Sequence, residues 1–160
     1  MLIETPRPDD APAIERLATN TGVFTPEEIR VVGEMLGSFF NPDPQDDHTF
    51  IIYRNGNPNG VSGFACYGPT PLTDHVWDLY WICVDRAEQS HGIGSELLER
   101  VEANVRTQSG RAIYLETSDS DDYARARGFY VHQGYECVAH ISDFYSPGEG
   151  KVIYRKHITT

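Results

Sequence analysis

The feature that most constrains the fold is an apolar stretch that ends in a glycine-containing loop and runs directly into an amphipathic pattern. Residues 77–84 (WDLYWICV) have the composition of a buried strand, and residues 93–105 repeat apolar side chains at helical spacing. Between them stands the segment Gln89-Ser-His-Gly-Ile-Gly94. Glycines let the backbone approach a ligand closely, and the first turn of a helix offers free N–H groups and a positive dipole end. The pattern therefore predicts a strand, an anion-binding loop and a helix, in that order.

This loop differs from two common phosphate-binding motifs, because no Lys follows its glycines and the third Gly of the dinucleotide fingerprint is missing. It resembles the Arg/Gln-x-x-Gly-x-Gly/Ala motif of the GCN5-related N-acetyltransferase (GNAT) family. In that family the loop holds the pyrophosphate of an acyl-coenzyme A. The resemblance implies that acetyl-CoA is the co-substrate and that it is contacted by Gln89, Ser90, His91, Gly92, Ile93, Gly94 and the following Ser95. The variable loop positions, often basic in the family, are Ser90 and His91 here.

A second segment, residues 123–135, resembles the family's Arg-x-Phe-Tyr-x-x-x-Gly-Phe/Tyr motif. The matching positions are Arg127, Phe129, Tyr130, Gly134 and Tyr135. Many family members use the tyrosine as the general acid that protonates the departing thiolate, which implies this role for Tyr130; the alternative is an ordinary core tyrosine. Tyr123 stands two helical turns earlier on the same face, where many relatives have an Asn that touches the pantetheine, so it is a candidate coenzyme contact.

Local patterns predict the other elements. Thr25-Pro-Glu-Glu28 has the form of a capping box at a helix start, and Gly134 is a helix stop. Strands are expected at about 1–5, 48–54, 60–67, 75–84, 111–117, 135–145 and 151–158, with a hairpin turn at 55–60 and helices after residues 9, 25, 92 and 120. Glu102 and Arg106 are expected to pair on the exposed side of the third helix.

The resulting order, β-α-α-β-β-β-α-β-α-β-β, is that of the GNAT fold. We therefore expect an α/β protein of the GNAT type, a three-layer α/β/α sandwich with a mixed, mostly antiparallel central sheet. Its length of 160 residues predicts a single N-acetyltransferase domain over residues 1–160.

Acyl transfer from a thioester requires an oriented neutral amine, stabilisation of charge on the carbonyl oxygen, and a proton for the thiolate, without a metal. In the family the central strand separates from its neighbour near a bulge. The resemblance implies that the freed backbone groups of Ile82, Cys83 and Val84 bind the pantetheine arm and the acyl carbonyl.

The base that deprotonates the amine has two candidates, Asp78 and Glu116, while some family members use only water, and Asp78 is equally a candidate anchor for the substrate amine. Strand alternation over residues 76–84 places Trp77, Leu79, Trp81 and Cys83 on one apolar face and Asp78 on the other, with Tyr80, Ile82 and Val84. A carboxylate such as Asp78 is seldom placed in an apolar strand without a partner or a task. Glu116 ends the neighbouring strand, where some relatives, notably protein N-terminal acetylases, carry a catalytic Glu; a solvated strand-end residue is the alternative.

Composition limits the partners. The net charge of −11, with Lys151 and Lys156 as the only lysines, argues against nucleic-acid binding and favours amine-bearing cations as acceptors. No apolar stretch approaches the roughly 20 residues of a membrane span and no signal peptide is evident, so a cytoplasmic protein without membrane association is expected. Cys66, Cys83 and Cys137 lie in apolar runs and are interpreted as reduced core thiols rather than metal ligands.

The acceptor is less constrained by the sequence. Phe24, Tyr80, Asp143 and Tyr145 suggest, with Asp78, a pocket for a small amine or an amino-acid-like molecule, although these residues could simply pack the sheet edge. Protein N-terminal or lysine acetylation stays open, as does a non-catalytic acyl-CoA-binding sensor module, since a fold does not establish an activity. The apolar final hairpin is a candidate homodimer contact, as in some relatives.

Overall fold

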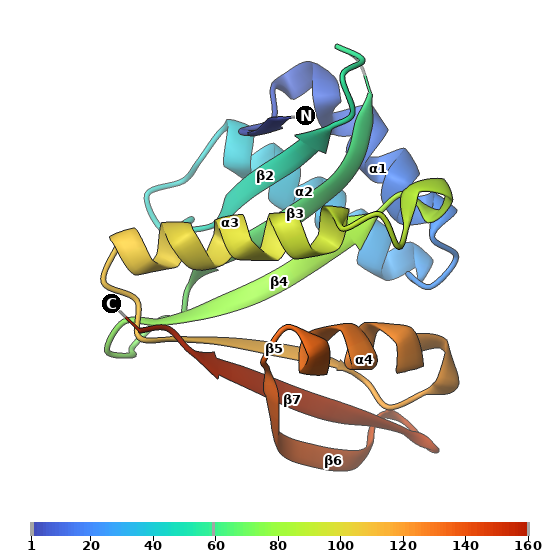
Figure 1. The fold of residues 1–160 in the computed structure, drawn as a ribbon, viewed down its shortest axis with the longest axis vertical. Helices are drawn as coiled ribbons and strands as arrows, with labels where there is room; N and C mark the ends of the chain where they lie inside the picture. The colour runs from blue at the N-terminus through green and yellow to red at the C-terminus, as the bar shows by residue number, and fades with distance from the viewer. Residues whose placement is uncertain (1, 59, 160) are drawn as a thin grey trace.

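The computed structural model describes residues 2–58 and 60–159, and the predicted elements occur there in the predicted order (Figure 1). They are β1 (Leu2–Glu4), α1 (Ala11–Asn20), α2 (Pro26–Phe40), β2 (Thr49–Arg54), β3 (Val61–Pro69), β4 (Val76–Val84), α3 (Ile93–Thr107), β5 (Ala112–Ser118), α4 (Ala124–His132), β6 (Glu136–Ser146) and β7 (Glu149–His157). Short 3₁₀ turns precede α1, α3 and α4. Met1 and Asn59, which belong to the predicted first strand and first hairpin turn, lie outside the described residues.

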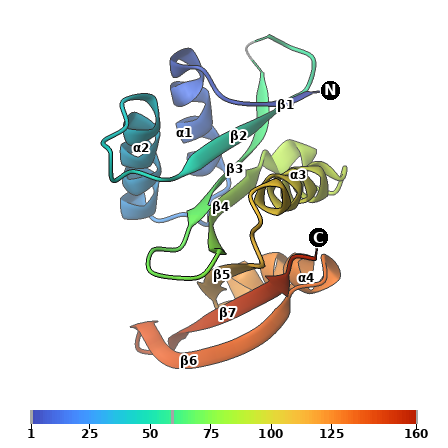
Figure 2. The same cartoon turned by 90° about the vertical axis from the view of Figure 1, so that its left-hand side faces the viewer.

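The seven strands form one sheet in the order β1-β2-β3-β4-β5-β7-β6, and every neighbouring pair is antiparallel except β4 and β5. Helices α1 and α2 cover one face, while α3 and α4 cover the other (Figure 2). Apolar side chains recur on one side of each of the three longer helices, so the core lies in two layers on either side of the sheet. The predicted three-layer, mostly antiparallel fold is confirmed.

The parallel pair at the centre of the sheet is short. β4 and β5 pair only at Val76 with Ala112, Trp77 with Ile113 and Asp78 with Tyr114. Beyond Asp78, β4 continues along β3 and β5 continues along β7, so the two central strands separate. This is the separation that the family resemblance implied.

Strand β4 also contains a bulge, as expected. Tyr67 pairs with Leu79 and the adjacent Cys66 pairs with Trp81, which leaves Tyr80 as an extra residue in β4. An inserted residue exchanges the two faces of the strand from that point on.

The expectation that all odd-numbered residues of β4 share one apolar face is therefore wrong. Before the bulge, Trp77 and Leu79 pack on the α3 side of the sheet. After the bulge, Cys83 and Trp81 pack on the α1 and α2 side, and Ile82 and Val84 take over the α3 side.

Local signals define the helix ends well. The hydroxyl of Thr25 accepts a hydrogen bond from the Glu28 N–H (3.1 Å), and the Glu28 carboxylate accepts one from the Thr25 N–H (3.2 Å), which confirms the capping box. Gly134 has φ +88° just after α4, as a helix stop requires. The predicted pair of Glu102 with Arg106 is absent: Glu102 is buried and its carboxylate binds Lys156 Nζ (2.9 Å).

The structure also bears on the expectations for the cysteines, for a membrane span and for a metal site. Cys66 and Cys83 are buried, and burial raises the pKa of Cys83 to about 12, whereas Cys137 is exposed on the edge strand β6 and is not a core thiol. Within residues 2–58 and 60–159, no helix is long and apolar enough to cross a membrane, and no group of three or more His, Cys, Asp or Glu side chains could hold a metal ion.

Candidate active site

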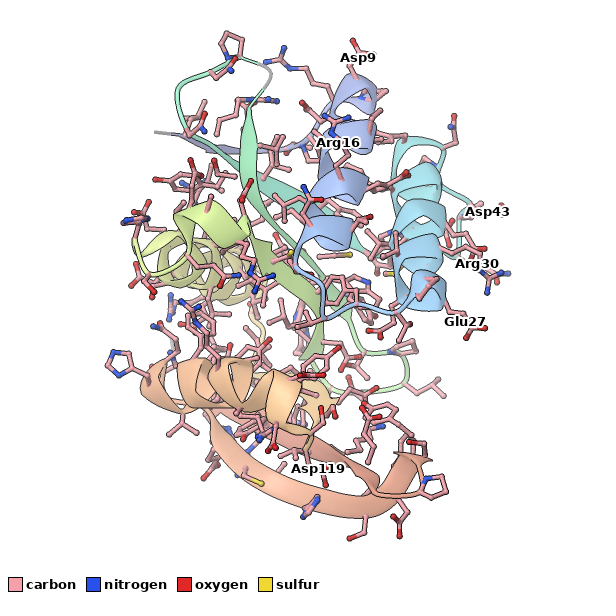
Figure 3. All side chains as sticks on the ribbon, turned by 90° about the vertical axis from the view of Figure 1, so that its right-hand side faces the viewer. Asp9, Arg16, Glu27, Arg30, Asp43 and Asp119 are labelled. Atoms are coloured by element: carbon pink, nitrogen blue, oxygen red, sulfur yellow. The ribbon has the colours of Figure 1, made fainter. Side chains whose placement is uncertain are left out.

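A cleft of about 1840 Å³ opens where β4 and β5 separate. Its walls come from the α1–α2 junction, β4, the Gln89–Gly94 loop, β5, α4 and the β6–β7 hairpin; Figure 3 shows α2 on one side, with Glu27 and Arg30, and α4 above the hairpin on the other. Pockets for a single small ligand usually measure about 300–1,000 Å³, so this cleft has room for two ligands end to end. All the site residues predicted from the sequence line it except His91 and Asp143.

One end of the cleft is formed by the glycine-containing loop. Ser90 (φ +70°) and Gly92 (φ +85°) both adopt the left-handed region, a backbone conformation typical of loops whose N–H groups form anion-binding concavities. The Gln89 side chain donates a hydrogen bond to the Val84 carbonyl oxygen (3.2 Å) and so ties the loop to the end of β4. Because α3 begins at Ile93, the loop lies at its N-terminus, where the helix dipole favours an anion.

The second glycine of the motif serves a packing role. A Cβ atom at Gly94 would lie 3.3 Å from the Phe129 ring, so this position allows α4 to pack closely on the first turn of α3. Gln133 Nε2 donates to Ser95 Oγ (2.8 Å), and this bond joins the same two helices. The Ser95 hydroxyl, predicted to bind phosphate, is thus already engaged with α4.

The His91 side chain, predicted to contact the coenzyme, has a contact within the chain. Its ring nitrogen Nδ1 lies 3.1 Å from the Glu88 carbonyl oxygen, and its side chain is not part of the cleft lining. The imidazole therefore stabilises the turn that precedes the loop. What His91 offers to an anion is its backbone N–H group.

The structure brings Arg125 to the loop, which the sequence reasoning missed. Its Nη2 donates a hydrogen bond to Ser90 Oγ (2.6 Å), and its side chain lines the cleft. A faint signal was present, since Arg125 stands four residues before Phe129 and therefore on the same face of α4. Arg86, in the turn that follows β4, also lines the cleft.

Tyr130 lies on α4 between the two ends of the cleft and is buried. Its ring packs against Tyr135 and Tyr154, with centroid distances of 6.1 and 6.0 Å. Burial raises the pKa of its phenol above the ordinary value, and the nearby Cys83 and Tyr123 raise it further. The side chain therefore carries its proton at neutral pH and faces the cleft, as a proton donor must.

Asp78 and Glu116 stand at the point where the strands separate. Asp78 belongs to the last β4–β5 pair and Glu116 follows two residues after its partner in β5. The Asp78 carboxylate accepts a hydrogen bond from Thr70 Oγ1 (2.8 Å); burial raises its pKa, and the charge of Glu116 adds to this effect. Glu116 forms an ion pair with Lys151.

The other end of the cleft is aromatic and acidic. Phe24 packs edge-on against Trp81, with a centroid distance of 5.4 Å, and Tyr80 and Tyr145 complete the aromatic lining. Carboxylates that the sequence reasoning missed also line this end, namely Glu27, Glu28, Asp122 and Glu149. Burial raises the pKa of Tyr145 to about 12, with contributions from Glu116, Glu28 and Glu149.

Asp143, predicted to contact the acceptor, and Tyr123, predicted to contact the coenzyme, both have structural contacts of their own. Asp143 lies outside the cleft, where its Oδ1 accepts a hydrogen bond from the Gly148 N–H (2.7 Å) and holds the β6–β7 turn. Tyr123 lines the cleft, and its hydroxyl donates to the Val23 carbonyl oxygen (3.0 Å). This bond joins the start of α4 to the α1–α2 junction across the cleft.

Comparison with known proteins places this arrangement in a family. Residues 14–135 match the family described as "Acetyltransferase (GNAT) family". A crystal structure assigned to the GNAT family of acetyltransferases, from Desulfovibrio desulfuricans, shares 35% sequence identity, with a TM-score of 0.93 and coverage of 99% of each chain. A comparison with curated protein sequences gives no significant match.

More distant structures share the fold. An aminoglycoside 6'-N-acetyltransferase complexed with coenzyme A is 18% identical, with a TM-score of 0.77, over 100% of this chain and 98% of that one. The ribosomal-protein-S18-alanine N-acetyltransferase from Escherichia coli is 20% identical, with a TM-score of 0.75, over 99% and 94% of the two chains. With the loop, the separated strands and the family match in agreement, the chain belongs to the GNAT family of acetyltransferases.

Proposed function

We propose that the protein is an N-acetyltransferase that moves the acetyl group of acetyl-CoA to a primary amine on a small cationic acceptor. The observation that carries the proposal is the single cleft opened by β4 and β5, which joins an anion-binding loop at one end to an acidic, aromatic pocket at the other. Tyr130 and Asp78 line the same cleft, between a site suited to the donor and a site suited to the acceptor.

The donor end fits an acyl-coenzyme A. The loop from Gln89 to Gly94 and the N-terminus of α3 offer N–H groups and a positive dipole end to the diphosphate. The segment Ile82–Val84 has no strand partner on the β5 side, so its backbone can bind the pantetheine arm and polarise the acyl carbonyl. Acetyl-CoA supplies an already activated thioester.

The reaction then needs three proton transfers. In the proposed mechanism Asp78 accepts a proton from the acceptor ammonium, directly or through one water, and the neutral amine attacks the thioester carbonyl. The C–N bond forms and the C–S bond breaks, and Tyr130 gives its proton to the departing thiolate. The nitrogen of the new amide gives its surplus proton to the Tyr130 phenolate, and Asp78 releases its proton to solvent. Asp78 is preferred to Glu116 as the base because Lys151 already pairs with Glu116.

The acceptor end favours a small cation. Carboxylates from α2, β4, β5 and β7 line it. Of the arginines in the cleft lining, Arg86 and Arg125 belong to the turn after β4 and to α4, and Arg30, on α2, forms an ion pair with Glu34. The Tyr123–Val23 hydrogen bond bridges the cleft and limits the width available to a folded protein substrate.

A panel of amines tests the proposal. Release of free thiol from acetyl-CoA is measured with small di- and polyamines, single amino acids, neutral amines and peptides, and coenzyme A binding is measured in parallel by calorimetry. We expect the highest kcat/KM with the small polycationic amines. Turnover confined to peptides would show that the acceptor is a peptide rather than a small amine. Tight binding of coenzyme A without turnover of any amine would favour an acyl-CoA sensor.

A further inference from the structure

We propose that Arg125 supplies the positive charge that the anion-binding loop itself lacks and that its guanidinium contacts the diphosphate of the donor; this rests on the proposed use of acetyl-CoA. The loop positions between Gln89 and Gly92 hold a serine and a histidine rather than Lys or Arg, and the histidine contacts the Glu88 carbonyl oxygen and is not part of the cleft lining. The loop itself then offers backbone N–H groups and the Ser90 hydroxyl, but no positive side chain, to a ligand that carries two adjacent negative charges.

The position of Arg125 suits this task. Its Nη2 lies 2.6 Å from Ser90 Oγ, so the guanidinium is held at the loop although it belongs to α4. Arginine presents five donors in a rigid, planar fork, and one bond to Ser90 leaves the others free for oxygen atoms of a diphosphate. Among the residues that the structure describes, no carboxylate is paired with Arg125.

Contacts between α4 and the start of α3 determine where the guanidinium of Arg125 lies. Phe129 packs over Gly94 and Gln133 binds Ser95, so α4 is fastened to the start of α3 one and two turns beyond Arg125. The backbone at Ser90 is held in the left-handed region, a conformation that costs a residue with a side chain free energy and recurs at ligand sites. Helix α4, which carries Tyr130, therefore also places the Arg125 guanidinium beside the proposed donor site.

Binding of coenzyme A fragments to the full chain tests this inference. Arg125→Gln is compared with the parent and with Arg106→Gln, a control on α3 whose side chain binds the Thr159 carbonyl oxygen outside the cleft lining. Calorimetry gives Kd for coenzyme A and for dephospho-coenzyme A, which lacks the 3'-phosphate but keeps the diphosphate. Ligand-observed NMR gives Kd for pantetheine, which carries no phosphate.

We expect Arg125→Gln to raise Kd about 10- to 100-fold for both coenzyme A and dephospho-coenzyme A, to leave Kd for pantetheine unchanged, and to reduce the salt dependence of binding. Arg125→Lys, which keeps the charge, should recover part of the loss, and Arg106→Gln should match the parent. An equal loss for pantetheine would show a structural role and overturn the inference, as would a loss that disappears with dephospho-coenzyme A. Failure of the parent to bind any coenzyme A would instead overturn the proposed function.

Discussion

Tyr130 is the residue on which the proposed chemistry depends most directly. It is buried against two other tyrosines, and burial raises the pKa of its phenol, so Tyr130 is protonated at neutral pH and holds a proton for the departing thiolate. Replacing it with Phe keeps the packing and removes only the hydroxyl. We expect Tyr130→Phe to lower kcat about 10²- to 10⁴-fold, with Kd for coenzyme A unchanged, when the chemical step limits turnover.

Tyr154→Phe is a matched control, because Tyr154 packs on Tyr130 but does not line the cleft. Its kcat should stay within about twofold of the parent. A Tyr130→Phe variant with normal kcat under chemistry-limited conditions would exclude Tyr130 as the acid.

Asp78 is expected to determine the acidic limb of the pH–rate profile. Its pKa is raised by burial and by Glu116, and a base must be ionised, so kcat/KM should fall at a pH above the ordinary aspartate value of about 3.9. Asp78→Asn should abolish most of the activity, whereas Glu116→Gln should keep the limb but move it to lower pH, because the neighbouring charge is removed. If both variants keep the limb and the rate of the parent, neither residue is the base.

The raised pKa of Asp78 also determines how the stability of the fold changes with pH. A carboxyl group whose pKa is higher in the folded state stabilises the fold below its unfolded pKa and loses this contribution as the pH rises through the folded pKa. Asn keeps an oxygen for the Thr70 hydroxyl and has no charge to desolvate. Asp78→Asn should therefore have a higher Tm than the parent at pH 7 and an equal Tm near pH 3, as measured by calorimetry.

At the scale of helices and strands, the sequence predicted the features that depend on residues close together in the chain. The capping box at Thr25, the helix stop at Gly134 and the strand–loop–helix order around Gly92 depend on residues close together in the chain, and all three are present. The two faces of β4 were assigned wrongly because the bulge at Tyr80 depends on how β3 pairs with β4, which alternation within one strand does not contain.

Contacts between distant segments were likewise not predictable from periodicity. Arg125 reaches Ser90, 35 positions away, and Tyr123 reaches Val23, 100 positions away. Both contacts arise because α4 packs against the loop and spans the separated strands, which is a property of the assembled fold. Asp143 shows the opposite case: the sequence suggested a ligand contact, and in the structure its carboxylate accepts a hydrogen bond within the β6–β7 turn, outside the cleft lining.

The bridge between α4 and the α1–α2 junction predicts a specific effect on the acceptor. Tyr123→Phe removes the hydroxyl that binds the Val23 carbonyl oxygen and leaves the ring in place. A neutral hydrogen bond is worth about 1 kcal/mol net, so we expect KM for the acceptor to rise about fivefold. Kd for coenzyme A should stay constant, and an unchanged acceptor KM would show that the bridge does not shape the acceptor end.

At the scale of the whole molecule, β6 is an unusual edge. It is eleven residues long, and four of its apolar side chains are exposed, namely Val138, Ile141, Phe144 and Tyr145. Long apolar edge strands tend to pair with another strand. We expect a homodimer that pairs through β6, detected by sedimentation equilibrium, and Ile141→Lys should shift it to monomer; a monomeric parent at micromolar concentration would exclude this contact.

The net charge of −11 acts over a longer range than any of these contacts. The screening length falls from about 30 Å at 0.01 M salt to about 8 Å at 0.15 M, so attraction of a cationic acceptor to the acidic end of the cleft should weaken over this range. We expect kcat/KM for a diamine to fall several-fold while kcat at saturation stays constant, since contacts inside the cleft are screened less. A neutral amine provides the control, because its kcat/KM should not change. An equal fall for both amines would show that salt acts on the donor, whose diphosphate the loop and Arg125 are proposed to hold, rather than on the acceptor.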